Sequence, residues 1–87
     1  MARYELRFRA SVAKDLRGIP RSDVERILSR IEALRDDPRP RWSEKLTAQE
    51  HYRIRQGSDR IVYGIEDAAL VVKVNKLGHR RDGYRKR

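Results

Sequence analysis

Residues 51–63 read HYRIRQGSDRIVY, two runs of alternating side chains on either side of a Gly57-Ser58 pair. Glycine at the first of two central positions is typical of a type II′ hairpin turn, and a two-residue turn fixes the register of its strands. Four pairs then lie directly opposite: Arg55 with Arg60, Ile54 with Ile61, Arg53 with Val62, and Tyr52 with Tyr63. Because opposed residues share a face, the register predicts a core side of tyrosine and isoleucine and an opposite side of arginine.

The arginine side of this hairpin is a candidate anion site. Alternate residues of a strand lie about 6.5 to 7 Å apart, so Arg53 and Arg55 can straddle a phosphate while Arg60 approaches from the neighbouring strand. Like charges placed directly opposite destabilise a sheet, so the pairing of Arg55 with Arg60 favours a bound anion. The alternative is a basic sheet surface without a function.

Upstream of the hairpin, the spacing of apolar residues predicts one strand and two helices. Residues 3–8 alternate as a strand does. Residues 11–17 have helical spacing and are followed by Gly18, a common helix stop. Residues 20–36 carry a longer apolar stripe and predict the second helix.

The ends of the second predicted helix are marked by proline and by capping residues. Pro20 suits a first helical position, whereas Ser22 and Glu25 form a capping box, so the helix can begin at either place. Pro38 ends it, because the residue before a proline disfavours helical geometry.

Downstream of the helices, residues 39–50 read as a loop whose Trp42 packs over the helices. Three strands follow, at residues 51–55, 60–66 and 70–77, and the last is nearly continuously apolar, as expected of a strand inside a sheet. The chain then ends in a basic segment at residues 78–87. The order β-α-α-β-β-β predicts a small α+β domain spanning residues 1–87, with an antiparallel-rich sheet, two N-terminal helices on one face and an open opposite face.

Composition restricts the kinds of function available to the 87-residue chain. It has 22 lysines and arginines against 13 acidic residues, a formal net charge of +9 and a pI near 10.6, values typical of nucleic-acid binding. The absence of cysteine excludes disulfides, thiolate catalysis and cysteine-based zinc sites. So short a chain favours a shallow site. Without an apolar run of signal or membrane length, we expect a cytoplasmic protein that does not enter the membrane.

The segment from Gly78 to Tyr84 adds further chemical groups after the last predicted strand. His79 can exchange protons near neutral pH, Arg80 can neutralise phosphoryl charge, and Tyr84 offers a ring for stacking and a hydroxyl. The alternative is structural: His79 only ends the strand, and Tyr84 packs on the sheet edge.

Several of these segments together resemble the RelE/ParE superfamily of toxins from bacterial toxin-antitoxin modules. No single motif is diagnostic, but the ordered set spans nearly the whole chain: Lys45-Leu46, Tyr52-Arg53-Ile54-Arg55, Asp59-Arg60-Ile61-Val62-Tyr63, Leu77-Gly78-His79-Arg80-Arg81 and Tyr84. The resemblance implies a toxin of a type II module, and a RelE-like toxin is a ribosome-dependent endoribonuclease that cuts messenger RNA. By position, the residues that match the site of the family are Arg53, Arg55, Arg60, Arg80 and Tyr84.

The reaction implied by the resemblance is attack of the ribose 2′-hydroxyl on the adjacent phosphate, without a metal or a cofactor. It requires a base, stabilisation of the phosphoryl charge, and protonation of the leaving oxygen. Family members often have lysine where Arg53 and Arg55 stand, and arginine does not deprotonate at neutral pH. We therefore hypothesise that His79 performs the acid or base work, with His51 or a ribosomal group in reserve.

Two other functions remain open at this point. A ParE-like toxin shares the fold but inhibits DNA gyrase through protein contact, and a plain nucleic-acid-binding module would need no chemistry. For either kind of toxin, the resemblance implies a cognate antitoxin, RelB-like for a RelE-like toxin, within a possible hetero-oligomer. We expect its contact surface to be acidic, because opposite charge relieves the repulsion among the arginines.

Overall fold

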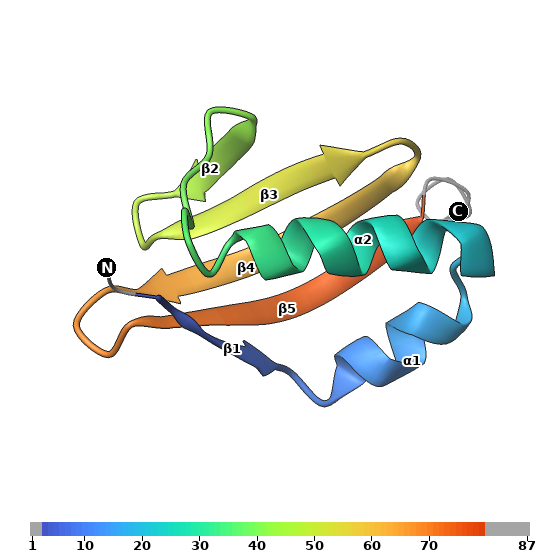
Figure 1. The fold of residues 1–87 in the computed structure, drawn as a ribbon, viewed down its shortest axis with the longest axis horizontal. Helices are drawn as coiled ribbons and strands as arrows, with labels where there is room; N and C mark the ends of the chain where they lie inside the picture. Colours follow the sequence, from blue (N-terminus) through green and yellow to red (C-terminus); the bar gives the residue numbers. More distant parts are fainter. Residues whose placement is uncertain (1–2, 80–87) are drawn as a thin grey trace.

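Residues 3–79 are described in a computed structural model, in which two helices lie on one side of a single sheet (Figure 1). The elements are β1 (Glu5–Phe8), α1 (Ser11–Arg17), α2 (Arg21–Ala33), β2 (Ser43–Thr47), β3 (His51–Gln56), β4 (Asp59–Glu66) and β5 (Val71–His79). This confirms the predicted α+β class and the predicted order, with one additional strand between the second helix and the hairpin. Neither helix is long or apolar enough to traverse a bilayer.

The sheet has the strand order β1-β5-β4-β3-β2. The β1 and β5 strands are parallel and the other three pairings are antiparallel. As the apolar run predicted, β5 lies inside the sheet, between β1 and the central strand β4. Val71 and Val72 point to opposite sides of the sheet and both are buried, which explains why the sequence of β5 does not alternate there.

The hairpin of β3 and β4 has the register predicted from its turn. All four predicted pairs are present, and Gln56 opposite Asp59 closes the loop. Gly57 has φ +62°, whereas Ser58 is not among the residues with positive φ. A positive φ at the first central position alone is typical of the type II′ turn.

The ends of α2 differ from the predicted ones. The helix begins at Arg21, with the carbonyl of Pro20 accepting the N–H of Asp23 at 2.8 Å, and no side chain caps it, so the predicted capping box is not formed. It ends at Ala33 rather than at residue 36. The next three residues continue as tight turns with bonds to the third preceding carbonyl, such as Asp36 N to Ala33 O at 3.2 Å.

The loop predicted for residues 39–50 is wrong in part, because it contains the edge strand β2. Most of this strand is exposed, so its sequence carries no alternation of buried and exposed residues from which a strand can be predicted. Backbone pairing with β3 defines it instead, in the register Ser43–Ile54 and Glu44–Arg53. Trp42, just before the strand, does pack against α2, with the Arg30 guanidinium 4.4 Å from its ring centre.

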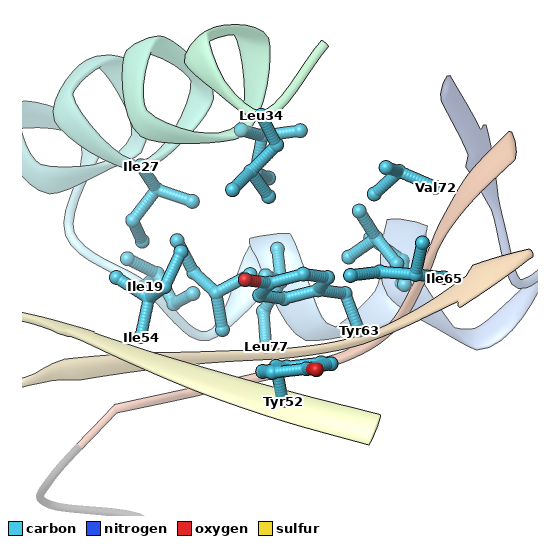
Figure 2. Packing of buried hydrophobic residues seen from close by; sticks show 13 residues of the cluster. Ile19, Ile27, Leu34, Tyr52, Ile54, Tyr63, Ile65, Val72 and Leu77 are labelled. Atoms are coloured by element: carbon cyan, nitrogen blue, oxygen red, sulfur yellow. The ribbon is translucent and has the colours of Figure 1, made fainter. Parts of the chain in front are cut away.

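The hydrophobic core lies between the helices and the sheet, and the apolar side of the hairpin forms much of its floor (Figure 2). The four hairpin residues predicted to face the core are all buried: Tyr52, Ile54, Ile61 and Tyr63. The rings of Tyr52 and Tyr63 stack with centroids 5.8 Å apart. The Tyr63 hydroxyl donates a 2.7 Å hydrogen bond to the Pro38 carbonyl, which satisfies the most deeply buried phenol.

Candidate nucleic-acid interface

The side of the sheet away from the helices carries most of the predicted site. Five cationic side chains project from its inner strands and form what we call the basic face: Arg53, Arg55, Arg60, Lys73 and Lys76. They come from the three adjacent strands β3, β4 and β5. Arg7 of the edge strand β1 lies opposite Lys73 and is paired with Glu5. Cations from neighbouring strands on an uncovered sheet surface are suited to binding a polyanion.

The Arg55 and Arg60 pair stands at the hairpin end of the basic face. The two residues are directly opposite, and the next residue across the sheet is Gly78 of β5, which has no side chain. Arg55 is exposed and Arg60 half-buried. Within residues 3–79, no carboxylate lies within salt-bridge distance of either guanidinium. The pair therefore holds two uncompensated charges side by side.

Arg53 differs from the other two predicted arginines because it has a carboxylate partner. Its Nε and Nη2 both donate to Glu44 Oε1 on β2, at 3.1 and 2.8 Å. These bonds, and the positive charges of Arg53 and Arg55, lower the pKa of Glu44. The carboxylate is thus ionised at neutral pH and holds the Arg53 fork against β2.

Lys76 reaches the basic face through an irregularity in β5. Val62 pairs with Lys76 and Tyr63 with Val74, so Asn75 is an extra residue of a β-bulge. The bulge reverses the alternation: Lys76 is exposed opposite Val62, and Leu77 is buried. Sequence reasoning missed both Lys76 and Lys73 as members of the site, although the alternation of residues 70–74 could have identified Lys73.

A cleft beside the C-terminal half of β5, beyond the residues that pair with β1, extends the basic face toward α1. It is lined by Lys14 and Asp15 of α1 and by Arg60, Lys76 and His79, among others. The Asp15 carboxylate accepts the Leu77 N–H at 3.0 Å and so satisfies an edge donor of β5. Two of the cations of the basic face therefore also border this cleft.

His79 borders the cleft beside Arg60 but does not lie on the basic face. It pairs with Asp59, which lies on the helix side of the sheet and is only 1% exposed. His79 Nδ1 is 2.5 Å from Asp59 Oδ1. Asp23 of α2 completes a cluster in which one side-chain N or O atom of each residue lies within 4.8 Å of those of the other two. Burial, and then the nearby charge of Asp23, raise the pKa of Asp59, against the opposing effect of its bond to His79. The geometry gives this imidazole a structural partner beneath the hairpin turn.

The remaining predicted residues, Arg80 and Tyr84, lie outside the described residues. Their roles stay predictions. Glu44 is part of the site because it binds Arg53. The sequence did not single it out, because residues 39–50 were predicted as a loop. Only the strand pairing places it opposite Arg53.

Comparisons with known proteins agree with this fold. Residues 6–84 match the family model described as the ParE toxin of the type II toxin-antitoxin system parDE. No curated protein sequence matches the chain at a significant level.

Solved structures with the same fold come from toxin-antitoxin modules. A chain of the archaeal RelE-RelB complex from Pyrococcus horikoshii is 28% identical with a TM-score of 0.76, over 88% of this chain and 94% of that one. A chain of the RelBE2 complex of Mycobacterium tuberculosis is 24% identical with a TM-score of 0.79, over 92% and 94%. The isolated RelE toxin of E. coli is 23% identical with a TM-score of 0.77, over 87% and 83%. With its family model covering nearly its whole length, the chain belongs to the ParE toxin family of type II toxin-antitoxin systems, within the RelE/ParE superfamily.

Proposed function

We propose that this toxin is a ribosome-dependent endoribonuclease that binds messenger RNA on the basic face. The observation that carries the proposal is the Arg55 and Arg60 pair, two opposed guanidiniums without a carboxylate partner in residues 3–79. Such a pair is unfavourable in the free protein and becomes favourable when a phosphate lies over it. A ribosomal target implies that the toxin acts in the cytoplasm.

The basic face suits one of the three tasks of RNA cleavage by the 2′-hydroxyl. Preorganised guanidiniums stabilise the charge that develops on the phosphoryl oxygens during attack. We assign this task to Arg55 and Arg60, with Arg53 oriented by its two bonds to Glu44. The resemblance adds Arg80 as a further phosphate ligand and Tyr84 as a stacking ring. In the proposed reaction these side chains take the place of a metal, and the products are a cyclic phosphate and a free 5′-hydroxyl.

The second candidate function is inhibition of DNA gyrase by protein contact. The observation that favours it is the family model, which is that of ParE toxins. In this reading the basic face is an interaction surface, and no residue needs to transfer a proton.

We also propose that a cognate antitoxin covers the basic face. The similar structures from Pyrococcus horikoshii and Mycobacterium tuberculosis are complexes of a toxin with an antitoxin. An acidic antitoxin segment would neutralise Arg55 and Arg60 in the same manner as a phosphate, and therefore would compete with RNA.

The experiment compares the two targets directly. The purified toxin is incubated with ribosomes programmed with a defined message, and cut sites are mapped by primer extension; a parallel reaction measures gyrase supercoiling. We expect codon-phased cuts in the message and unimpaired supercoiling. Intact message with gyrase trapped on DNA would reject the ribonuclease in favour of the second function.

A pair of matched variants connects the activity to the basic face. Arg60→Ala is expected to lower the cleavage rate by roughly 10² to 10³, the usual cost of removing one group that stabilises transition-state charge. Arg21→Ala makes the same change at an exposed position of α2, on the helix side, and is expected to cut at the wild-type rate. Equal rates for the two variants would remove the basic face from the mechanism.

A further inference from the structure

The imidazole of His51 lies on the same side of the sheet as the basic face. His51 is the first residue of β3, and alternation puts it on the side of Arg53 and away from buried Tyr52. Directly opposite on β4 is Gly64, and opposite Gly64 on β5 is Lys73. The second imidazole, His79, is on the other side, bonded to Asp59. Among residues 3–79, His51 is thus the one imidazole on the basic face itself, whereas His79 borders only the adjoining cleft.

Gly64 creates the space in which the ring of His51 lies. A Cβ at Gly64 would be 3.0 Å from His51 Cδ2 and 3.4 Å from His51 Nε2, closer than side chains normally approach. The same point is 3.7 Å from Nδ2 of Asn75, the bulge residue of β5. Gly64 does not have a positive φ, so its backbone does not require glycine. The missing side chain lets the ring lie over the central strand instead of projecting into solvent.

The other ring nitrogen of His51 faces Thr47 on β2. Nδ1 is 3.5 Å from Thr47 Oγ1, the outer limit of a hydrogen bond, and that oxygen already accepts the Gln49 N–H at 3.0 Å. If Nδ1–H also donates to this oxygen, Nε2 keeps its lone pair and faces the sheet centre. The hydrogen-bond partner of one ring nitrogen thus determines whether the other nitrogen carries a proton.

The charged groups on the same side of the sheet as His51 are of both signs. They are Arg53 on β3 with its partner Glu44 on β2, Lys73 on β5 with Arg7 of β1 opposite it, and Glu66 two residues beyond Gly64 on β4. Along β3, Arg53 is about 7 Å and Arg55 about 13 Å from His51, so a phosphate within reach of both His51 and Arg55 lies between them, over Arg53. A base and charge-stabilising groups on one surface are the combination that cleavage by a 2′-hydroxyl requires.

We propose that His51, seated over Gly64, is the proton-transfer residue of RNA cleavage, and this inference rests on the proposed ribonuclease function. Nε2 takes the proton of the ribose 2′-hydroxyl as the bond between that oxygen and phosphorus forms. The bond from phosphorus to the 5′-oxygen breaks, and the leaving oxygen takes a proton from water. The products are a 2′,3′-cyclic phosphate and a 5′-hydroxyl, and the imidazolium then returns its proton to solvent.

The test is the single-turnover cleavage rate of the full chain on programmed ribosomes, measured across the pH range in which imidazole titrates. We expect His51→Gln to lower the rate by roughly 100-fold or more, the low end of the usual effect of a general base, and to remove the rise of the rate with pH. Added imidazole is expected to restore part of the rate to His51→Ala. His79→Gln should keep the dependence on pH whatever it does to the rate.

A second variant tests the seat rather than the imidazole. Gly64→Ala keeps His51 but displaces its ring, so it should lower the rate while unfolding at a urea concentration close to that of the wild type. Wild-type rates and an unchanged pH profile in His51→Gln, with cleavage by the wild type intact, would overturn this inference alone. No cleavage by the wild type would overturn the ribonuclease function and this inference with it.

Discussion

Replacing Arg55 with glutamine should make the free toxin more stable and at the same time less active. Arg55 and Arg60 are directly opposite, where side chains lie about 4.5 to 5.5 Å apart at Cβ and like charges cost roughly 0.2 to 1 kcal/mol. Because Arg55 is exposed and partly screened, we expect about 0.5 kcal/mol of added stability. In a domain of this size that raises Tm by about 2 to 4 °C.

The same change should weaken RNA binding in a way that salt reveals. Each phosphate contact to a single strand contributes about 0.7 to the slope of log affinity against log salt. Arg55→Gln should therefore reduce the slope by about that amount, while its cleavage rate falls. A gain of stability together with a loss of function is what is expected when a site holds charges for a ligand rather than for folding.

The assay is urea unfolding of wild type and Arg55→Gln at low and high salt, with filter binding of a short RNA at several salt concentrations. The stability difference should shrink at high salt, since the repulsion is screened. Arg21→Gln, on the helix side, is the control for RNA binding and should leave the salt slope unchanged. The reasoning would be refuted if Arg55→Gln unfolded at lower urea than the wild type, or if its gain were equally large at high salt.

Two further predictions concern the fold. Hydrogen bonds, chiefly from Arg39, lower the pKa of Glu50 to about 2 from an ordinary 4.5, so its contribution to stability is complete above 4.5 and is lost as pH falls toward 2. Glu50→Gln should flatten this part of the curve of urea midpoint against pH, and Glu66→Gln should leave it in place. Tyr63→Phe should cost about 1 to 2 kcal/mol, because it leaves the Pro38 carbonyl without its donor; an unchanged Tm would contradict this.

Residues 51–63 show how much local sequence can determine. The two-residue turn allows one register, and in that register every tyrosine and isoleucine falls on one side and every arginine on the other, with Val62 opposite Arg53. A slip of one residue would bury arginine, so turn geometry and hydrophobicity agree. The same holds for the helices, whose apolar spacing is visible in the chain, although their last turns depend on local hydrogen bonds that spacing does not record.

Sequence alone did not determine where charged residues meet when they come from separate strands. The β2 strand is an exposed edge without a hydrophobic pattern, so only its backbone pairing brings Glu44 to Arg53. The bulge at Asn75 reverses the alternation of β5 and so sends Lys76 to the basic face. The side on which each histidine lies also follows from long-range register: His51 faces outward over Gly64, and His79 turns inward to Asp59. Alternation along a strand is a local property, whereas its phase relative to neighbouring strands is decided by tertiary pairing.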